Sequence, residues 1–215
     1  VSASQLLFLV EYATFNTQTA IGRGVTDKTD DGATNMGEVT GATTGLGNGS
    51  GAAAGTDGLV SISYRGEENF WGNIWKWVDG LNVYAYSTNY AYIADHGFAD
   101  DTSTGYANAG FTLAKANGYI SAFGYSRDYD WLFLPSAVAG SDSNPVGDYF
   151  YQSNTTAGFL VALLGGNWNN SSSAGGCCWL LSYASSDRGR GVGARSLQLA
   201  PSIAPSSRVS LYSLT

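Results

Sequence analysis

Two adjacent cysteines, Cys177 and Cys178, are the only thiols in the chain and its first candidates for chemistry. A pair of reactive thiols binds copper or takes part in redox reactions when both sulfurs reach one site. A disulfide between neighbours closes a strained small ring, so a structural disulfide framework is not expected. The cysteines therefore do not indicate a redox compartment.

A polar segment, residues 94–110, holds the only histidine, His96, beside Asp95, Asp100 and Asp101. One histidine with irregularly spaced carboxylates lacks the ligand spacing of a metal site. The same histidine has no motif of a hydrolytic triad around it. The sequence therefore predicts a solvated loop here, with no metal and no cofactor.

Two other patterns are also weak candidates for a catalytic or phosphate site. Asp128 and Asp130 form a carboxylate pair suited to acid–base work, but turn stabilisation or pairing with Arg127 is the better interpretation, because no His or Lys lies nearby. The glycine-rich segment GLGNGSG lacks the Lys-Ser/Thr of a phosphate-binding loop. We therefore expect that the protein is not an enzyme.

Composition limits the class of protein. A chain of 215 residues fits one domain with a substantial core. Charged residues make up 13% of the chain, about half the usual share, and the net charge is −7. This balance argues against binding to nucleic acid or to an anionic membrane, which requires a basic surface.

The sequence has neither a membrane-spanning nor a targeting pattern. Its apolar runs end well short of the about 20 residues that a transmembrane helix needs. The chain begins inside what reads as a continuing element, without Met or a signal peptide. We therefore expect an N-terminal portion to precede Val1.

Two helices are predicted from the hydrophobic pattern. Apolar residues recur at spacings of three and four over residues 3–20, which is typical of an amphipathic helix that ends at Gly22. Residues 65–80 are predicted to form a second helix, with acidic residues at its start and Gly80 at its end. Its three tryptophans are interpreted as core packing rather than as a sugar-stacking site.

Alternating and continuous apolar runs predict the strands. The run at 158–164 is continuously apolar and is expected to be a central strand. Residues 26–57 show no apolar period and are expected to form a loop insertion. The other predicted strands lie at 59–64, at 81–93 as a pair around a turn at 87–89, and at 148–152, and residues 118–125 are expected to form a short strand or a turn.

The stretch Gly165–Leu197 interleaves two kinds of residue. Asn, Ser, Gly, Cys, Tyr, Asp and Arg follow no period, and the stretch contains no Lys, Glu, Gln or Met. Between them lie residues that suit a fixed framework, because they form tight turns, bury rings or anchor backbone. These are Gly165, Gly166, Trp168, Gly175, Trp179, Leu181, Gly193, Ala194 and Arg195.

Several segments together resemble the variable proteins of diversity-generating retroelements, which occur in phages and gut bacteria. They are LLFLVEYATFNTQTAIG, YRGEENFWGNIWKWVDG, NGYISAFGYSRDYDWLFLPS, VGDYFYQ and ALLGGNWNN…AGGCCW…ASSDRGRGVGAR. The resemblance covers most of the chain up to about Leu197, and residues 198–215 do not match. It implies a C-type-lectin-like α+β fold, with two helices around small antiparallel sheets and long loops. It also implies a single domain, 1–215, with the insertion at 26–57 and a variable region at 165–197.

In that family a reverse transcriptase installs errors at adenines near the 3′ end of the gene. Randomised Asn codons then end in a pyrimidine and never specify Lys, Glu, Gln, Met or Trp, in agreement with the four types absent from 165–197. The resemblance assigns Trp168, Trp179 and Arg195 to the scaffold. It assigns ligand-facing, variable status to Asn167, Asn169, Ser173, Cys177, Cys178, Leu180, Ser182, Tyr183, Asp187, Gly189 and Gly191.

The resemblance implies a receptor-recognition module on a phage tail or bacterial surface, whose partner is a protein or glycan on a target cell. It implies neither nucleic-acid binding nor membrane insertion. Two alternatives remain, an oxidoreductase of the formylglycine-generating type, whose C-terminal frame GGNW…GAR is similar, and a structural tail or fibre protein. Calcium-dependent sugar binding is not expected, because Trp168 is followed by Asn169-Asn170 and Pro145 by Val146.

Overall fold

The computed structural model describes residues 2–12, 16–29, 32, 36–85, 88–153 and 157–194. Within these ranges the chain forms two α-helices and twelve strands. No helix there is long and apolar enough to span a bilayer. The helices are α1 (Ser2–Tyr12) and α2 (Thr17–Ile21).

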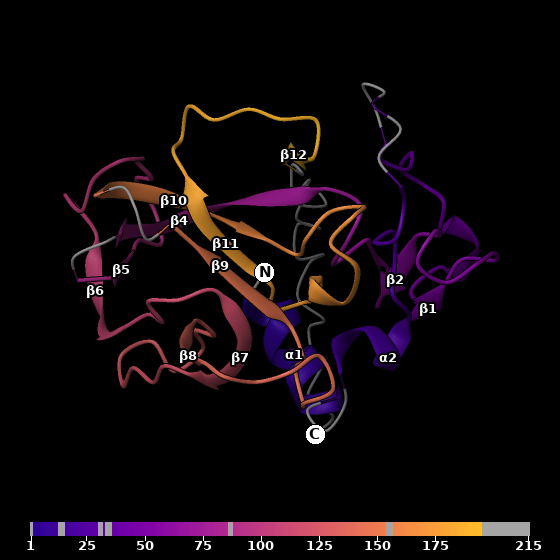
Figure 1. Ribbon diagram of the computed structural model, residues 1–215, viewed down its shortest axis with the longest axis horizontal. Coiled ribbons are helices and arrows are strands. Elements are labelled where there is room, and N and C mark those ends of the chain that lie inside the picture. The colour runs from indigo at the N-terminus through magenta and orange to yellow at the C-terminus, as the bar shows by residue number, and fades with distance from the viewer. Residues whose placement is uncertain are drawn as a thin grey trace, which may run out of the picture.

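Most strands belong to one strongly curved sheet, which is nearly closed into a barrel (Figure 1). Their order is β6-β5-β4-β10-β11-β9-β7-β8, and β12 pairs with β4 outside this path. The strands are β4 (Trp75–Ala85), β5 (Tyr90–Ile93), β6 (Ala107–Thr112), β7 (Gly118–Phe123), β8 (Pro135–Val138), β9 (Tyr149–Gln152), β10 (Gly158–Leu164), β11 (Trp179–Tyr183) and β12 (Val192–Gly193).

This architecture contradicts the predicted α+β C-type-lectin-like fold. The protein has a β-rich fold in which one large sheet encloses the main core, rather than two helices around small sheets. The core contains aliphatic side chains from β4, β5, β10 and β11, with Phe150 and Trp179 among the largest. Curvature lets a single sheet bury one face against itself, so helices are not needed to cover that face.

A second, small sheet packs beside the helices. It consists of β1 (Gly51–Ala52), β2 (Ile62–Tyr64) and β3 (Glu67–Glu68), and the short 3₁₀ helix η1 (Thr44–Leu46) precedes it. Phe8 of α1 packs edge-on against Tyr64 and Trp71, with ring centroids 5.6 and 5.4 Å away. This separate aromatic core joins the N-terminal helices to the small sheet and to the turns that precede β4.

The helix predicted over residues 65–80 is wrong. This segment forms β3, a series of turns and the first half of β4. Asn69, Gly72 and Asn73 all have positive φ, which an α-helix does not accept. Aromatic residues at alternate positions suit a strand, and here pairing with β10 outweighs the helical spacing of the same residues.

The other predicted elements are closer to the structure. The strand pair at 81–93 is confirmed as antiparallel β4 and β5, and the central strand at 158–164 is confirmed as β10 between β4 and β11. The helix predicted at 3–20 divides into α1 and α2, and the Asn16 side chain caps α2 by accepting a hydrogen bond from the Gln18 amide. Gly22 ends α2 as predicted.

Two loop predictions differ from the structure or extend beyond it. The predicted loop at 94–110 includes the start of β6, which its small and polar residues did not indicate. The described part of 26–57 contains only η1 and β1 as regular elements. The turn residue Ser87 and the tail 198–215 lie outside the described residues.

A bulge in β4 sets the direction of its side chains. Between the pairs Asn82–Val161 and Val78–Ala162, β4 has three residues more than β10. Gly80 lies in this bulge with φ +80°, and a Cβ atom there would come within 2.4 Å of the Ala94 carbonyl oxygen. The bulge therefore requires glycine both for its backbone conformation and for this close approach.

We predict that Gly80→Ala destabilises the fold more than Gly97→Ala. Gly97 also has positive φ (+61°), but no atom lies within 4 Å of its added Cβ, so its variant incurs only the left-handed strain of about 1–2 kcal/mol. Gly80→Ala adds a steric clash worth about 1–3 kcal/mol. Urea unfolding of both variants measures the difference, and equal losses would contradict the assigned role of the bulge.

A second prediction concerns Tyr64, which is 2% exposed and donates a hydrogen bond to Glu11 on α1 at 2.9 Å. Burial, followed by this hydrogen bond, raises the pKa of Tyr64 from 10.0 to about 12. The contribution to stability is therefore complete below pH 10 and is lost as the pH rises through about 12. We expect the urea midpoint of the native chain to fall more steeply over this range than that of Tyr64→Phe. Parallel pH profiles would refute the assignment.

Candidate functional site

The outer face of the large sheet carries the candidate site. In the strand register, Trp77 of β4 pairs with Leu163 of β10, Leu163 pairs with Leu180 of β11, and Leu180 pairs with Tyr151 of β9. Paired residues point to the same side of a sheet. These four side chains therefore form a line across four strands, on the side opposite the enclosed core.

A bulge in β11 adds a fifth residue to this face. Val161 pairs with Tyr183, whereas Leu163 pairs with Leu180, so β11 has one residue more than β10 between the two pairs. Tyr183 and Leu180 are three positions apart and yet point to the same side, which a regular strand does not allow. The Tyr183 ring consequently lies 6.3 Å from the Trp77 ring.

Further aromatic rings extend the line toward β7. Trp75 lies 5.9 Å from Tyr151, Tyr151 lies 4.5 Å from Tyr149, and Tyr149 lies 5.0 Å from Tyr119, all between ring centroids. Trp75 is buried beneath the others, which are half-buried. We call these six residues the aromatic row: Trp75, Trp77, Tyr119, Tyr149, Tyr151 and Tyr183.

Hydroxyl and amide groups border the row at the short 3₁₀ helix η2 (Ser171–Ser173). Ser172 and Tyr119 share a hydrogen bond of 2.9 Å between their hydroxyl groups, and the Asn170 amide donates to the Tyr151 hydroxyl at 3.4 Å. Burial raises the pKa of Tyr151, while its hydrogen bond with Ser173 opposes this rise. This border therefore offers neutral hydrogen-bonding groups.

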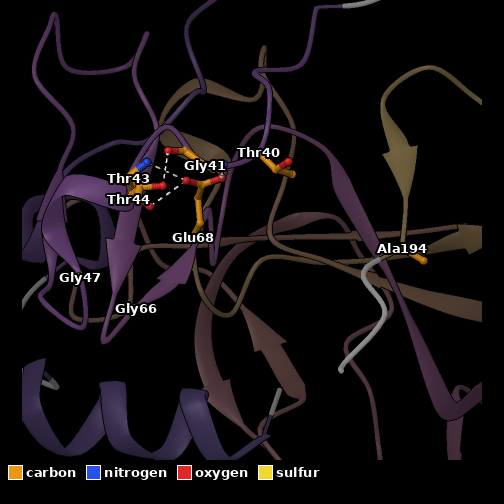
Figure 2. A pocket seen from close by; sticks show the side chains of 8 residues that line it. All are labelled: Thr40, Gly41, Thr43, Thr44, Gly47, Gly66, Glu68 and Ala194. Atoms are coloured by element: carbon orange, nitrogen blue, oxygen red, sulfur yellow. Dashed lines mark hydrogen bonds between the residues drawn. The ribbon is translucent and has the colours of Figure 1, made fainter. Parts of the chain in front are cut away.

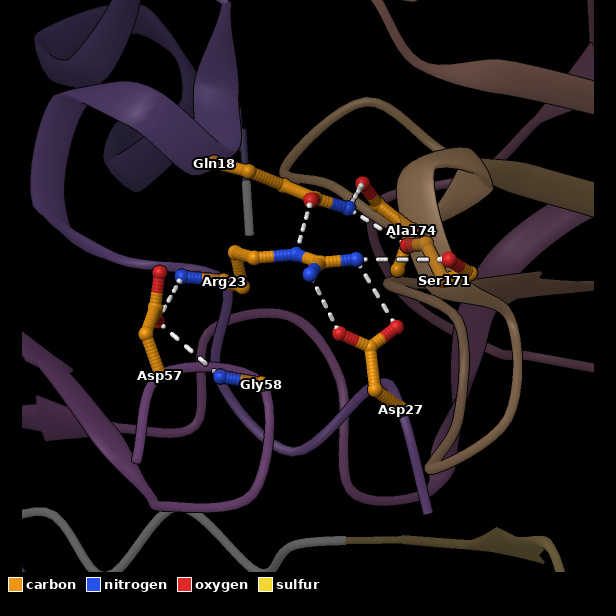
Figure 3. A network of polar contacts seen from close by, with 7 residues as sticks. All are labelled: Gln18, Arg23, Asp27, Asp57, Gly58, Ser171 and Ala174. Atoms are coloured by element: carbon orange, nitrogen blue, oxygen red, sulfur yellow. Dashed lines mark hydrogen bonds and ion pairs between the residues drawn. The ribbon is translucent and has the colours of Figure 1, made fainter. Parts of the chain in front are cut away.

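A polar network holds η2 in place beneath this border (Figure 3). The Gln18 amide donates to the carbonyl oxygens of Ser171 and Ala174 at 2.6 and 2.9 Å. Arg23 pairs with Asp27 at 2.6 Å and donates to the Ser171 hydroxyl at 3.3 Å. The N-terminal helices thereby position a loop that follows them by about 150 residues.

The loop between β11 and β12 borders the other side of the row and arches away from the sheet in Figure 1. Asp187 closes its first turn by accepting a hydrogen bond from the Ala184 amide at 2.9 Å. The Gly191 carbonyl oxygen accepts from the Trp75 amide at 2.8 Å and returns the loop to β4. A cavity of about 330 Å³ next to this loop is lined by residues that include Trp77, Val161 and Ser185.

Both cysteines are buried, which corrects the prediction that they are exposed thiols on a binding face. Cys177 belongs to the enclosed core, whereas Cys178 packs with Trp75, Leu163 and Leu180 on the other side of the sheet. Burial, followed by the charge of Asp148, raises the pKa of both thiols well above the ordinary value. Two protonated thiols in separate clusters do not form the reactive, copper-binding pair that the oxidoreductase alternative needs.

The eleven residues predicted to face a ligand divide by exposure. Those that solvent reaches, at least in part, are Asn167, Asn169, Ser173, Ser182, Tyr183, Asp187 and Gly189. Those that are buried are Cys177, Cys178, Leu180 and Gly191.

Two members of the exposed group contact the aromatic row. Ser173 contacts the Tyr151 hydroxyl, and Tyr183 belongs to the row itself. Gly191 brings the later loop back to the earlier one, because a Cβ atom there would come within 2.7 Å of the Asn167 amide nitrogen. The predicted scaffold residues Trp168 and Trp179 are 2% and 3% exposed, and Arg195 lies outside the described residues.

The structure does not assemble the other sequence candidates into a site. His96 contacts the neighbouring Asp95, and Asp101 accepts a hydrogen bond from Ser185 at 2.7 Å. Within the described ranges, no three His, Cys, Asp or Glu residues lie close enough to hold a metal ion. Asp128 and Asp130 are both exposed on the loop between β7 and β8.

The glycine-rich segment borders a cleft of about 540 Å³ that is unsuited to phosphate (Figure 2). The Glu68 carboxylate accepts hydrogen bonds from the amides of Gly41 and Thr43 at 2.9 and 2.7 Å, and from the Thr43 hydroxyl at 2.7 Å. The Glu68 carboxylate thus already accepts hydrogen bonds from these donors, and its negative charge repels a phosphate group.

Five members of the row were missed as site residues by sequence reasoning: Trp75, Trp77, Tyr119, Tyr149 and Tyr151. Alternating tyrosines in DYFYQ indicated a strand, but no signal in the sequence told which side faces solvent.

Comparison of the chain with protein-family models and with curated proteins gives no match. The function is therefore argued from the residues and their geometry.

Thiol labelling tests the burial of the cysteines. In the native protein we expect neither Cys177 nor Cys178 to react with Ellman's reagent at mildly alkaline pH, because both are 0% exposed and their pKa values are raised. After unfolding in urea we expect both thiols to react. Rapid labelling of the folded chain would contradict the assigned positions.

Proposed function

We propose that this protein is a non-enzymatic recognition module, diversified by a retroelement, that binds a partner on a cell surface through the aromatic row and its borders. One observation carries the proposal. Seven residues of the predicted variable set reach solvent, and two of them, Ser173 and Tyr183, contact the aromatic row, whose rings other than Trp75 are half-buried. The proposal rests on this surface and on the sequence resemblance, and does not require a lectin-type fold.

The division between backbone and side chains supports diversification at this surface. The loop at 165–174 is held through main-chain groups, including the Gly165 amide bonded to the Cys178 carbonyl oxygen at 2.8 Å. Main-chain hydrogen bonds do not depend on the type of side chain. Asn169 can therefore vary on a loop whose path is fixed by its neighbours.

The partner is a protein or a glycan on the surface of a target cell, and the module belongs on a phage tail or a bacterial surface. Tyr183 and Trp77 provide rigid aromatic contacts, and the Asn and Ser side chains provide adaptable polar ones, as in antibody paratopes. A role as a tail or fibre component is compatible with this function. The oxidoreductase alternative lacks support, because the thiols are buried and protonated.

Substitution of exposed variable residues tests the proposal. The triple variant Asn169→Tyr, Ser182→Asn and Asp187→Asn changes the surface while leaving both cores intact. Fluorescently labelled protein is incubated with a panel of bacterial strains, and the bound fluorescence is measured. We expect the amount bound to individual strains to change by about tenfold or more. The melting temperature should shift by no more than about 2–4 °C, since surface substitutions have small effects on stability.

A matched control carries Thr88→Tyr, Ser136→Asn and Asp128→Asn, the same kinds of change at described positions away from the row. It should bind the same strains as the native chain. If both triple variants bind the strain panel equally, the proposal is refuted. A large loss of stability in the variant at the row would also refute it.

The DNA that flanks the gene tests the retroelement separately. We expect a near-copy of the segment that encodes 165–197, differing at adenines, next to a reverse-transcriptase gene. If neither is present, diversification is refuted, and the binding test above still decides whether the surface recognises a partner.

A further inference from the structure

We propose that the aromatic row is a fixed stacking platform for an extended, neutral oligosaccharide, and that the variable residues at its borders select among sugars. This inference rests on the proposed function, because it names the class of partner that the same surface binds. It adds that most of the contact area belongs to residues that do not vary.

The shape of the row suits a chain of sugar rings. Its members lie on β4, β11, β9 and β7, and β10 lies between the first two. Five adjacent strands at about 4.8 Å spacing extend over about 19 Å, which is more than one sugar ring covers. The rings form two groups, with Leu163 and Leu180 between them. Within each group neighbouring ring centroids lie 4.5 to 6.3 Å apart and the ring planes are inclined by 42° to 85°, so the groups present both faces and edges of rings.

The chemistry of the row matches both the apolar face and the polar edge of a pyranose ring. The axial C–H groups of such a ring form an apolar, weakly positive face, which the negative π face of Tyr or Trp attracts. The hydroxyl groups of the sugar need donors and acceptors at the edge. Tyr119, Tyr151, Ser172 and Asn170 supply these in one hydrogen-bonded border.

Charge favours a neutral glycan over an anionic one. Neither the six residues of the row nor Asn170, Ser172 and Ser173 carry charge at neutral pH. Carboxylates outnumber cations beyond both ends. Asp79 and Asp100 line a cavity with Trp77, and Asp57 and Asp142, together with Arg23, line a cavity with Ser172. These carboxylates, on a chain of net charge −7, oppose uronic or sialic acids.

The row lies mostly outside the variable region. Trp75, Trp77, Tyr119, Tyr149 and Tyr151 precede Gly165, and Tyr183 is the single member inside 165–197. Diversification can therefore alter the hydrogen-bonding border while leaving the stacking surface unchanged. The structure thus separates general affinity for sugars from the choice of sugar.

Titration of the full chain with cellohexaose, xylohexaose, mannohexaose and chitohexaose tests the platform, with tryptophan fluorescence and calorimetry as readouts. We expect at least one hexasaccharide to bind and Tyr149→Ala to weaken it by about tenfold, because a stacking ring is removed. Tyr149→Phe keeps the ring and should bind within about twofold of the native chain.

Tyr92→Ala is the matched control, because Tyr92 is a half-buried tyrosine of β5 that contacts Phe159 at 5.8 Å, outside the row. It should retain native affinity, and thermal unfolding should show all three variants folded. Equal loss in Tyr92→Ala and Tyr149→Ala, or no loss in Tyr149→Ala, would overturn the platform.

The outcomes separate this inference from the proposed function. If no hexasaccharide binds up to about 10 mM, the platform is overturned, and strain binding that still depends on the variable residues would identify the partner as a protein. If a hexasaccharide binds through Tyr149 but the triple variant at 169, 182 and 187 keeps the same sugar preference and the same strains, the platform stands and selection by variable residues fails.

Discussion

Each side chain of β4, β10 and β11 points either into the enclosed core or onto the outer face, and the rest of the structure depends on this division. Successive residues of a strand alternate, so a shift by one position exchanges the two faces. The bulges in β4 and β11 determine locally which residues face the core and which lie on the outer face. Without the extra residue in β11, Tyr183 would not lie on the side of Leu180 and Trp77. The aromatic row is therefore a result of strand register.

The same division explains why the two cysteines differ in surroundings although they are neighbours. Cys177 lies with Trp179 and Leu181 in the enclosed core, and Cys178 lies beneath the aromatic row. Their amides and carbonyls are also used in the framework, since the Cys177 amide donates to the buried Asp148 at 2.6 Å. These positions carry packing and backbone roles that an exposed loop residue such as Asn169 does not have.

Rigidity at the candidate site comes from distant parts of the chain. Gln18 and Arg23 fix η2, the curved sheet fixes the rings, and Gly191 returns the loop after β11 to Trp75. A surface held in this way loses little conformational entropy on binding and tolerates exchange of its exposed side chains. These properties suit recognition of a partner without chemical conversion of it.

The sequence by itself determined the local features whose physics is short-range. It predicted the central strand at 158–164, the strand pair at 81–93 and the glycine that ends α2, because continuous apolar runs, turn residues and caps act within a few positions. It failed at 65–80, where aromatic residues at helical spacing form a strand because β10 pairs with them.

Only the tertiary structure decided the fold class, the burial of Cys177 and Cys178, and the gathering of Trp77, Tyr119, Tyr149 and Tyr151 beside the variable stretch. Each of these depends on which strands pair and in which register. Strand pairing joins residues far apart in the chain, such as Trp77 and Leu163, and the pattern of a single segment does not contain that information.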